Sequence, residues 1–397
     1  MKTLGSGLLP LLALLLGGCD PAPPDAYVQR LADALELPQP SLPAPTAWPR
    51  PRVRQAPVPE EKGDLLDFLA LQRCGLGAVL GARNGPLGRV MDGPERLRYE
   101  LRFREGAERC LTVLEGEERA RLEALLARKR ESWPAVLWNG TVGSPAWARL
   151  YAAGGEDWDP PPAIAGAAAL EALEPFRARM KALGPSPLGA SPEALAAAED
   201  PADWHGPWEA LTQQRYPGVA LHQLQRLTHA LEGAAMLLEQ RERQRPLCPQ
   251  GRPTPRARHV NAVFLRYYGA GLQPAMAELE RGLRPWLETT GKLWAQLQGG
   301  APLAARPALR GFLDPRAPGP WQAYLAARDR HTIQWQGVPA HARGDGPLVL
   351  GDLDALPTLA CADWRGVLGP EAKPRGATAG APGSAGAARK VAPRWGP

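Results

Sequence analysis

The densest group of polar side chains in the sequence surrounds a predicted turn near residue 85. Arg83 and Arg89 flank this turn with forked N–H donors, and Gly88 permits close backbone approach. Such residues could bind an anion or another small polar ligand. The structural alternative is that they cap helix ends, and that a nearby glutamate pairs with an arginine. The candidate ligand site comprises Arg83, Asn84, Arg89, Tyr99 and Glu100.

Catalytic and metal-binding patterns are weak. The sequence has no Gly-x-Ser-x-Gly elbow, phosphate-cradling loop or dinucleotide fingerprint, so we predict no catalytic residue and no cofactor. Because glycan-cleaving carboxylates need no local motif, a hydrolase with Glu100 in a cleft stays open. His222 and His229 share a predicted helix face, and His259 is the nearest third ligand. We predict no metal site.

A hydrophobic leader ends at a cysteine. Lys2 precedes the apolar run 8–16, which is too short to span a bilayer but long enough for a signal-peptide core. The next residues, Leu16–Cys19, resemble the lipobox of bacterial lipoproteins, in which cleavage after Gly18 frees a cysteine for lipidation. The alternative is an ordinary secretory signal followed by a disulfide cysteine. We expect Cys19 to carry the lipid on the periplasmic side, with Asp20 slightly favouring the inner membrane.

Four further cysteines remain: Cys74, Cys110, Cys248 and Cys361. An even number in an oxidising compartment predicts two disulfides, although four cysteines permit three pairings. We favour Cys74 with Cys110, because each lies on a predicted helix and a short turn joins the two helices. Cys248 with Cys361 follows by elimination.

The positive charge does not indicate nucleic acid. The formal charge is +6 with a pI near 9.2, but the arginines alternate with glutamates along predicted helices, as on solvated faces. A protein outside the cytoplasm would also rarely meet nucleic acid. Anionic lipid headgroups are a plausible partner for the basic segment Arg50–Arg54, which is close to the anchor in sequence.

Apolar periodicity predicts an all-α, bundle-like fold. The region from residue 38 to 59 is too rich in proline for a helix and reads as an extended strap, with Trp48 as its large anchor. Pro-broken, Trp-bearing segments should follow residue 130. The expected helices cover residues 26–37, 64–80, 94–114, 117–130, 164–183, 219–245, 272–297 and a short stretch near 321–330.

Two of these helices should form a long antiparallel pair. Residues 219–245 and 272–297 each carry an apolar seam with alternating steps of three and four. We expect Pro274 to open the second helix and Pro285 to kink it.

The expected organisation is a leader (1–18), a tether containing a short helix and the strap (19–62), a helical domain (63–368) and a disordered Ala/Gly/Pro tail (369–397). Residues 184–207 form a weak internal boundary. Near the end of the domain, His331–Trp335 and Leu348–Leu350 could pair as a small β-hairpin.

Several motifs together resemble the domain-of-unknown-function 3080 family of gram-negative bacterial lipoproteins. The resemblance extends from Tyr27 to about Leu297 and implies an envelope lipoprotein, with no known activity. Where the family usually has serines after the asparagine, this chain has Gly85–Pro86, which weakens the idea of a catalytic hydroxyl. The motifs are Leu65–Leu69, Cys74, Arg83–Asn84, Tyr99–Glu100, Cys110, Pro246–Pro249, Pro253–Pro255, Val263–Phe264 and Gln273–Pro274.

These observations favour a lipid-anchored periplasmic protein that acts as a non-catalytic binding or assembly component of the cell envelope. Its partner would be an envelope protein or murein. The 13 Trp suggest sugar stacking, although Trp204, Trp208, Trp286 and Trp294 occupy helix positions where core packing is the ordinary role. The alternative function is an envelope hydrolase acting on peptidoglycan.

Overall fold

A computed structural model describes residues 22–59, 69, 71–152, 157–183, 205–249 and 253–336. All regular structure in these residues is helical, which confirms the predicted all-α class. The predicted tail and Leu348–Leu350 lie outside the described residues. The prediction that His331–Trp335 forms the other strand of the hairpin is wrong, because this segment belongs to the last turns of a long helix.

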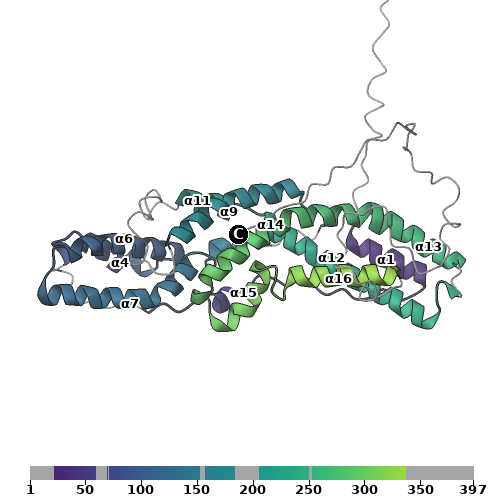
Figure 1. The fold of residues 1–397 in the computed structure, drawn as a ribbon, viewed down its shortest axis with the longest axis horizontal. Helices are drawn as coiled ribbons and strands as arrows, with labels where there is room; N and C mark the ends of the chain where they lie inside the picture. Colours follow the sequence, from purple (N-terminus) through teal and green to yellow (C-terminus); the bar gives the residue numbers. More distant parts are fainter. Residues whose placement is uncertain are drawn as a thin grey trace, which may run out of the picture.

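The helices have the following bounds, with the chain direction shown by colour in Figure 1. They are α1 (Pro24–Leu35), α2 (Pro51–Arg54), α4 (Gly77–Asn84), α5 (Pro86–Arg89), α6 (Gly93–Leu111), α7 (Gly116–Gly140), α8 (Pro145–Leu150), α9 (Ala163–Leu183), α11 (His205–Thr212), α12 (Tyr216–Gln244), α13 (Pro255–Val263), α14 (Gln273–Leu297), α15 (Arg306–Leu313) and α16 (Pro320–Gln336). A π-helix, η3 (Phe264–Leu272), and two 3₁₀ turns, η4 (Gln298–Gly300) and η5 (Leu303–Ala305), complete the set.

Several helices begin where a short polar side chain precedes or adjoins a proline. The side chains of Asp92, Ser144 and Thr254 each accept a hydrogen bond from the backbone N–H three residues later, at 2.9, 3.0 and 3.1 Å. A proline then occupies one of the first two helical positions, where its missing N–H leaves no bond unmade. The sequence therefore sets these helix starts locally.

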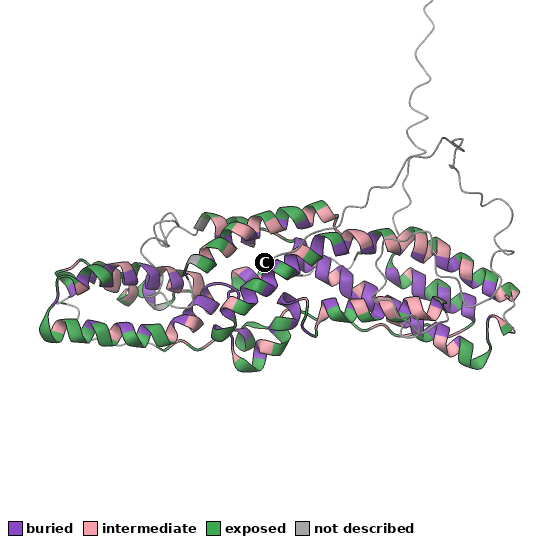
Figure 2. Ribbon diagram, viewed as in Figure 1, coloured by how far each residue is buried: buried purple, intermediate pink, exposed green. Residues whose placement is uncertain are grey.

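The molecule is elongated and has two apolar cores (Figure 1). The smaller core belongs to a lobe formed by residues 71–76, α4, α6 and the first half of α7, which we call the distal lobe. The larger core joins α1, the start of α6, the end of α7, α8, α9 and α11 to α16, so α6 contributes to both cores. Figure 2 shows buried residues running through the larger body and along the inner sides of α6 and α7. Helix α7 is thus shared between the two cores.

The predicted long pair exists, but each member has a more important neighbour. Helices α12 and α14 contact each other, while α12 packs more extensively against α16 and α1, and α14 against α9. The crossing of α9 and α14 is close, because a Cβ added at Gly166 would lie 2.7 Å from the Cα of Gly282. Only glycine at both positions allows this approach.

Pro274 is the second residue of α14, as predicted, but the helix does not start from a free end. It continues from α13 through the π-helix η3, and the backbone N–H of Gln273 bonds to the carbonyl of Tyr268, five residues back. Since Pro274 lacks an N–H, a local change of hydrogen-bond register lets the helix pass the proline without ending. Pro285 lies inside α14, as predicted.

Three further expectations change in the N-terminal half. Helix α1 is not part of a tether, because Tyr27, Val28 and Leu31 are completely buried in the larger core. The strap contains the short helix α2, although the proline content predicted none. The helix expected to end at residue 130 continues to residue 140, because Pro134 lies inside the 25-residue helix α7 and does not end it.

Candidate functional site

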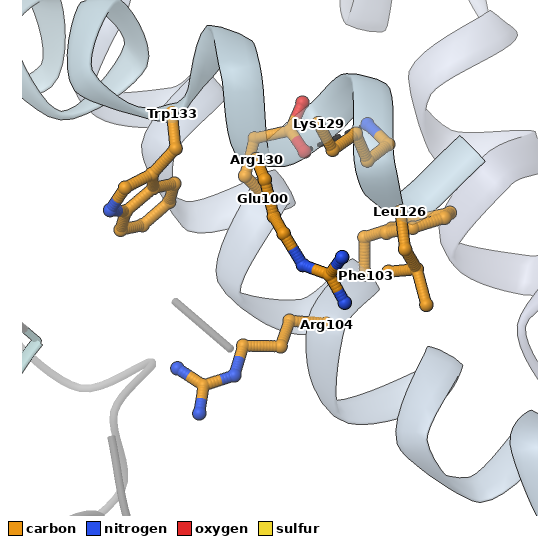
Figure 3. A pocket seen from close by; sticks show the side chains of 7 residues that line it. All are labelled: Glu100, Phe103, Arg104, Leu126, Lys129, Arg130 and Trp133. Atoms are coloured by element: carbon orange, nitrogen blue, oxygen red, sulfur yellow. Dashed lines mark hydrogen bonds and ion pairs between the residues drawn. The ribbon is translucent and has the colours of Figure 1, made fainter. Parts of the chain in front are cut away.

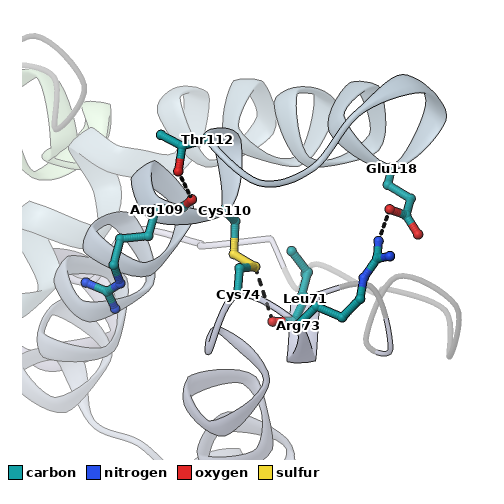
Figure 4. The surroundings of a disulfide bond; sticks show 7 residues. All are labelled: Leu71, Arg73, Cys74, Arg109, Cys110, Thr112 and Glu118. Carbon is teal, nitrogen blue, oxygen red and sulfur yellow. Dashed lines mark hydrogen bonds and ion pairs between the residues drawn. A yellow bond between two sulfur atoms is a disulfide. The ribbon is translucent and has the colours of Figure 1, made fainter.

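The distal lobe carries all five residues of the predicted ligand site. Arg83 and Asn84 end α4, Arg89 ends α5, and Tyr99 and Glu100 lie on α6. The loop before α4 is attached to α6 by a disulfide between Cys74 and Cys110, with their Cα atoms 5.1 Å apart (Figure 4). Cys110 lies on a helix as expected, whereas Cys74 lies in the turn before α4. The favoured pairing is therefore present in the structure.

The Arg83 turn is used structurally. The Arg83 guanidinium donates a hydrogen bond to the carbonyl of Gly88, which closes the turn between α4 and α5. Gly88 is itself packed against the backbone of the preceding helix, leaving no room for a Cβ. Asn84 is exposed, and the side chain of Arg89 is among those the structure does not describe. The structure thus engages Arg83 in the manner of the capping alternative.

Glu100 is held by two cations in the gap between α6 and α7. Its side chain is 7% exposed and accepts hydrogen bonds from Arg96 Nε at 2.8 Å and Lys129 Nζ at 2.7 Å (Figure 3 shows the pair with Lys129). Lys129 is also buried, and its ammonium lies 4.4 Å from the ring centre of Phe103 and 5.1 Å from that of Tyr99. Glu100 is consequently locked in an ion pair between helices.

Tyr99 is a neutral neighbour of this pair. Burial of its ring, and then the negative charge of Glu100, raise the pKa of Tyr99, while Arg96 and Arg83 oppose that change. The phenol therefore keeps its proton throughout the physiological range. Tyr99 contributes an aromatic face to Lys129 and Arg96 and supplies no base.

A small cavity lies beside the Glu100–Lys129 pair. Its volume is about 20 Å³, enough for roughly one water molecule. Two of its lining residues have buried N–H groups that find no hydrogen-bond partner among the described residues, Nη1 of Arg104 and Nε1 of Trp133. The full lining is Glu100, Phe103, Arg104, Leu126, Lys129, Arg130 and Trp133, shown in Figure 3.

This geometry suits a structural ion pair better than catalysis. Glycoside hydrolysis requires two carboxyl groups on either side of the scissile bond, whereas Glu100 is the single carboxylate lining this cavity. Each oxygen of Glu100 already accepts a charged donor. Within the described residues, no group of three His, Cys, Asp or Glu side chains is arranged to hold a metal ion.

Sequence reasoning missed most of the residues that surround Glu100. The spacing of four between Arg96 and Glu100 could have revealed one partner, since such pairs share a helix face. Lys129 gave no such signal, because it is 29 positions away and lies on a helix whose many charges indicated a solvated face. Arg104, four positions after Glu100 on α6, could have been found by the same spacing, whereas Trp133 falls in a stretch that the sequence predicted to be broken by prolines.

A second buried polar group joins α1 to α16. The Trp335 indole N–H donates to Nε2 of His331 at 3.0 Å, and the Tyr27 hydroxyl lies 2.8 Å from the same nitrogen. Nε2 must therefore accept, so the imidazole is neutral. Burial lowers the pKa of His331 to about 3. Sequence reasoning missed His331 because it placed this residue in a β-hairpin. The imidazole packs against Tyr268, with ring centres 4.6 Å apart.

The remaining candidate residues are dispersed. His222 and His229 are half-buried on α12, and His259 is exposed on α13. Burial, and then the charge of Arg226, lower the pKa of His222. Trp208, Trp286 and Trp294 are buried in the larger core and offer no face for a sugar; Trp204 lies outside the described residues. Cys248 is half-buried and disulfide-bonded, and Cys361 lies outside the described residues.

Comparison with known proteins gives a family but no activity. Neither the curated proteins nor the solved structures include a significant match to this chain. Among the described residues, no helix is both long and apolar enough to span a membrane. Residues 24–340 match the family described as protein of unknown function (DUF3080), a range that extends from the first turn of α1 to just beyond α16. This chain therefore belongs to the DUF3080 family.

Proposed function

We propose that this protein is a lipid-anchored envelope lipoprotein whose helical body acts as a non-catalytic binding or assembly component on the periplasmic side of a bacterial membrane. The observation that carries the proposal is the leader, in which an apolar run is followed by Leu16–Gly17–Gly18–Cys19. Lipidation of Cys19 would keep the body at a membrane surface and raise its effective concentration for partners there. Asp20 favours retention at the inner membrane.

The disulfide between Cys74 and Cys110 supports this compartment. Disulfides persist in oxidising compartments such as the periplasm and are rare in the cytoplasm. Here the bond joins two segments of one small core, so it has a structural role. With Cys110 buried and Cys74 partly buried, the bond is of the structural kind that proteins of oxidising compartments use.

The surroundings of Glu100 support a non-catalytic role. A general acid or nucleophile needs a carboxyl group that faces substrate, and Glu100 faces Arg96 and Lys129 in a gap with space for about one water. The geometry therefore weighs against the peptidoglycan hydrolase. Binding to an envelope protein or to murein would use the outer surface of the body.

Mass spectrometry of the native product tests the anchor. We expect a mature chain that begins at Cys19 and carries acyl groups on it, and a Cys19→Ala variant that is neither cleaved at this point nor acylated. A native chain with its leader intact, or one beginning elsewhere with an unmodified Cys19, would overturn the proposal. Crosslinking in intact cells with the wild type and the variant would then identify partners that depend on anchoring.

A further inference from the structure

The strap and the segment after α14 together form a basic, partly apolar corner of the body. Helix α2 contacts η5, and in Figure 1 the dark purple α2 lies beside α15 at the lower edge of the molecule. We call residues 50–55 and 303–310 the α2–α15 corner. Val53 is 45% exposed and Leu303 is 75% exposed, both large values for aliphatic side chains. Arg50 and Arg52 are exposed beside them.

The corner is fixed rigidly to the larger body. Arg54, which the sequence grouped with the basic segment, is buried and donates to the carbonyls of Gly143 at 3.1 Å and Pro49 at 3.0 Å. Its own carbonyl accepts from the Trp138 indole at 2.6 Å. Because the third arginine of the segment is used for attachment, α2 is held with its other side chains directed outward. The exposure of Val53 is thus built into the fold.

The charge in this part of the molecule is strongly positive. Residues 38–59 and 299–320 contain six arginines, and Asp314 is their single acidic residue. Asp314 is 3% exposed and already pairs with Arg310 and Arg316. Arg50 and Arg52 make no ion pair in the described part of the chain. The corner therefore presents uncompensated positive charge beside exposed apolar side chains.

We propose that the α2–α15 corner docks onto the anionic phospholipid headgroups of the membrane that carries the protein, with Val53 and Leu303 entering the interface. Arginines beside aliphatic side chains are the combination that binds to such surfaces, because the charge attracts the headgroups and the apolar groups insert among them. Each arginine near an anionic leaflet raises membrane partitioning by roughly fivefold. The corner would give the anchored body a fixed orientation.

This inference rests on the proposed anchor, which makes contact with the bilayer easy. Pro24, the first residue of α1, is five positions after Cys19, so even an extended chain holds the start of α1 within about 18 Å of the lipidated cysteine. The body therefore stays close to the headgroups. A surface contact then needs little additional loss of freedom.

Vesicle flotation tests the corner separately from the lipid. The mature-length chain, which begins at residue 19 and carries Cys19→Ala so that it has neither leader nor lipid, is mixed with vesicles of phosphatidylcholine alone or with about 30% phosphatidylglycerol, at low and at high salt. We expect the partition coefficient to be at least about tenfold higher on the anionic vesicles at low salt, and to fall toward the neutral value at high salt. Equal binding to both vesicle types, or none, would overturn the proposal.

Paired variants assign the effect to these residues. Arg50→Glu/Arg52→Glu should reduce binding to anionic vesicles by about tenfold or more. Arg102→Glu/Arg258→Glu, which changes the same charge at exposed positions elsewhere, should reduce it by less than about threefold. Val53→Ser/Leu303→Ser should weaken binding at both salt concentrations. If both charge reversals weaken binding equally, net charge is responsible and the corner is not a docking surface.

The two proposals fail in different ways. An unmodified Cys19 in the native protein would overturn the anchor, while the flotation experiment would still report on the corner because its protein lacks the acylated cysteine. Conversely, if the native protein is lipidated but its Cys19→Ala variant does not prefer anionic vesicles, the anchor is supported and the docking surface is overturned. Unchanged thermal unfolding of the variants confirms that exposed side chains alone were altered.

Discussion

At the residue scale, two buried titratable side chains have opposite surroundings. Glu100 pairs with Arg96 and Lys129, while His331 is neutral among aromatic rings. The sequence shows both residue types but not their full surroundings, since each has one partner on another helix, Lys129 for Glu100 and Tyr27 for His331. Tyr27, for example, is 304 positions from His331. Their partners are therefore set by packing.

His331 should make the protein less stable in mild acid. Its pKa of about 3 in the folded state is below the ordinary value of 6.5, so the unfolded chain binds the proton first as pH falls. Stability is fully present above pH 6.5 and declines toward pH 3. Between pH 7 and about pH 4.5 this group should remove about 2 to 3 kcal/mol from the free energy of unfolding.

Urea unfolding of wild type and His331→Gln at both pH values checks this. The variant should lose less stability on acidification by about that amount, because its side chain accepts hydrogen bonds without titrating. Tyr27 and Tyr268, which face the imidazole from α1 and η3, stay neutral throughout. Groups such as Asp314 titrate in both proteins and cancel. Parallel pH profiles would show that His331 is not protonated on unfolding.

The Glu100–Lys129 pair should matter for stability in the way that buried ion pairs do. Lys129→Met should cost about 3 kcal/mol, because it leaves Glu100 buried with one cation fewer. Glu100→Gln/Lys129→Met should recover part of this loss. Arg243→Met, which removes an exposed pair with Glu239 at 3.7 Å, should cost less than about 0.5 kcal/mol. A Lys129→Met protein of unchanged stability that loses its cellular phenotype would instead identify a ligand site.

At the scale of the element, the extended part of the strap is held by side chains of neighbouring helices. Two side-chain amides each pair with both backbone groups of one strap residue. Gln225 on α12 does so with Thr46, at 2.7 and 3.2 Å, and Asn139 on α7 does so with Ala56, at 2.8 and 2.7 Å. Each amide thus supplies the donor and the acceptor that a neighbouring β-strand would otherwise supply. The strap needs them because a proline-rich segment is poorly suited to pairing in a sheet.

Asn139→Ala should release the end of the strap. The N–H and carbonyl of Ala56 would each lose a partner, and two such losses at a partly buried position should cost about 2 kcal/mol. We expect faster hydrogen exchange around residues 53–58 with little change in α12. Asn84→Ala, at an exposed position, should affect neither. Unchanged exchange in Asn139→Ala would show that the bonds of Arg54 secure this end of the strap without Asn139.

On the scale of the whole molecule, the two cores suggest unequal stability. The larger core takes side chains from eleven of the α-helices named above, α1, α6 to α9 and α11 to α16, whereas the distal lobe depends on α4, α6 and part of α7. The Cys74–Cys110 disulfide closes a loop between residues 36 apart within this smaller core. Small cores bury less apolar area per residue and gain more from such a crosslink.

Removal of that disulfide should therefore act locally. Cys74→Ser/Cys110→Ser should cost about 3 to 4 kcal/mol, the loop entropy expected for a separation of 36 residues. Amide exchange in α6 should accelerate while that in α12 stays near its wild-type rate. Equal acceleration in both helices would show that the two cores unfold as one cooperative unit.

The sequence by itself determined much of this protein. Helix positions followed from apolar spacing and from local start signals such as Asp92 and Thr254, and the Cys74–Cys110 pair followed from the short connection between two segments. These features depend on neighbours within a few turns, so local chemistry is enough to specify them. Family membership likewise follows from motifs along the chain.

Only the tertiary structure decided which helices became partners and which polar groups became buried. Periodicity marks the apolar face of α12 but cannot say that α16 and α1 cover more of it than α14 does. The sequence patterns placed His331 in a strand and Arg54 in a basic segment facing lipid headgroups. In the folded protein, both side chains are buried and form hydrogen bonds. Burial and pairing depend on contacts between residues far apart in the chain, and a single sequence carries no direct record of those distances.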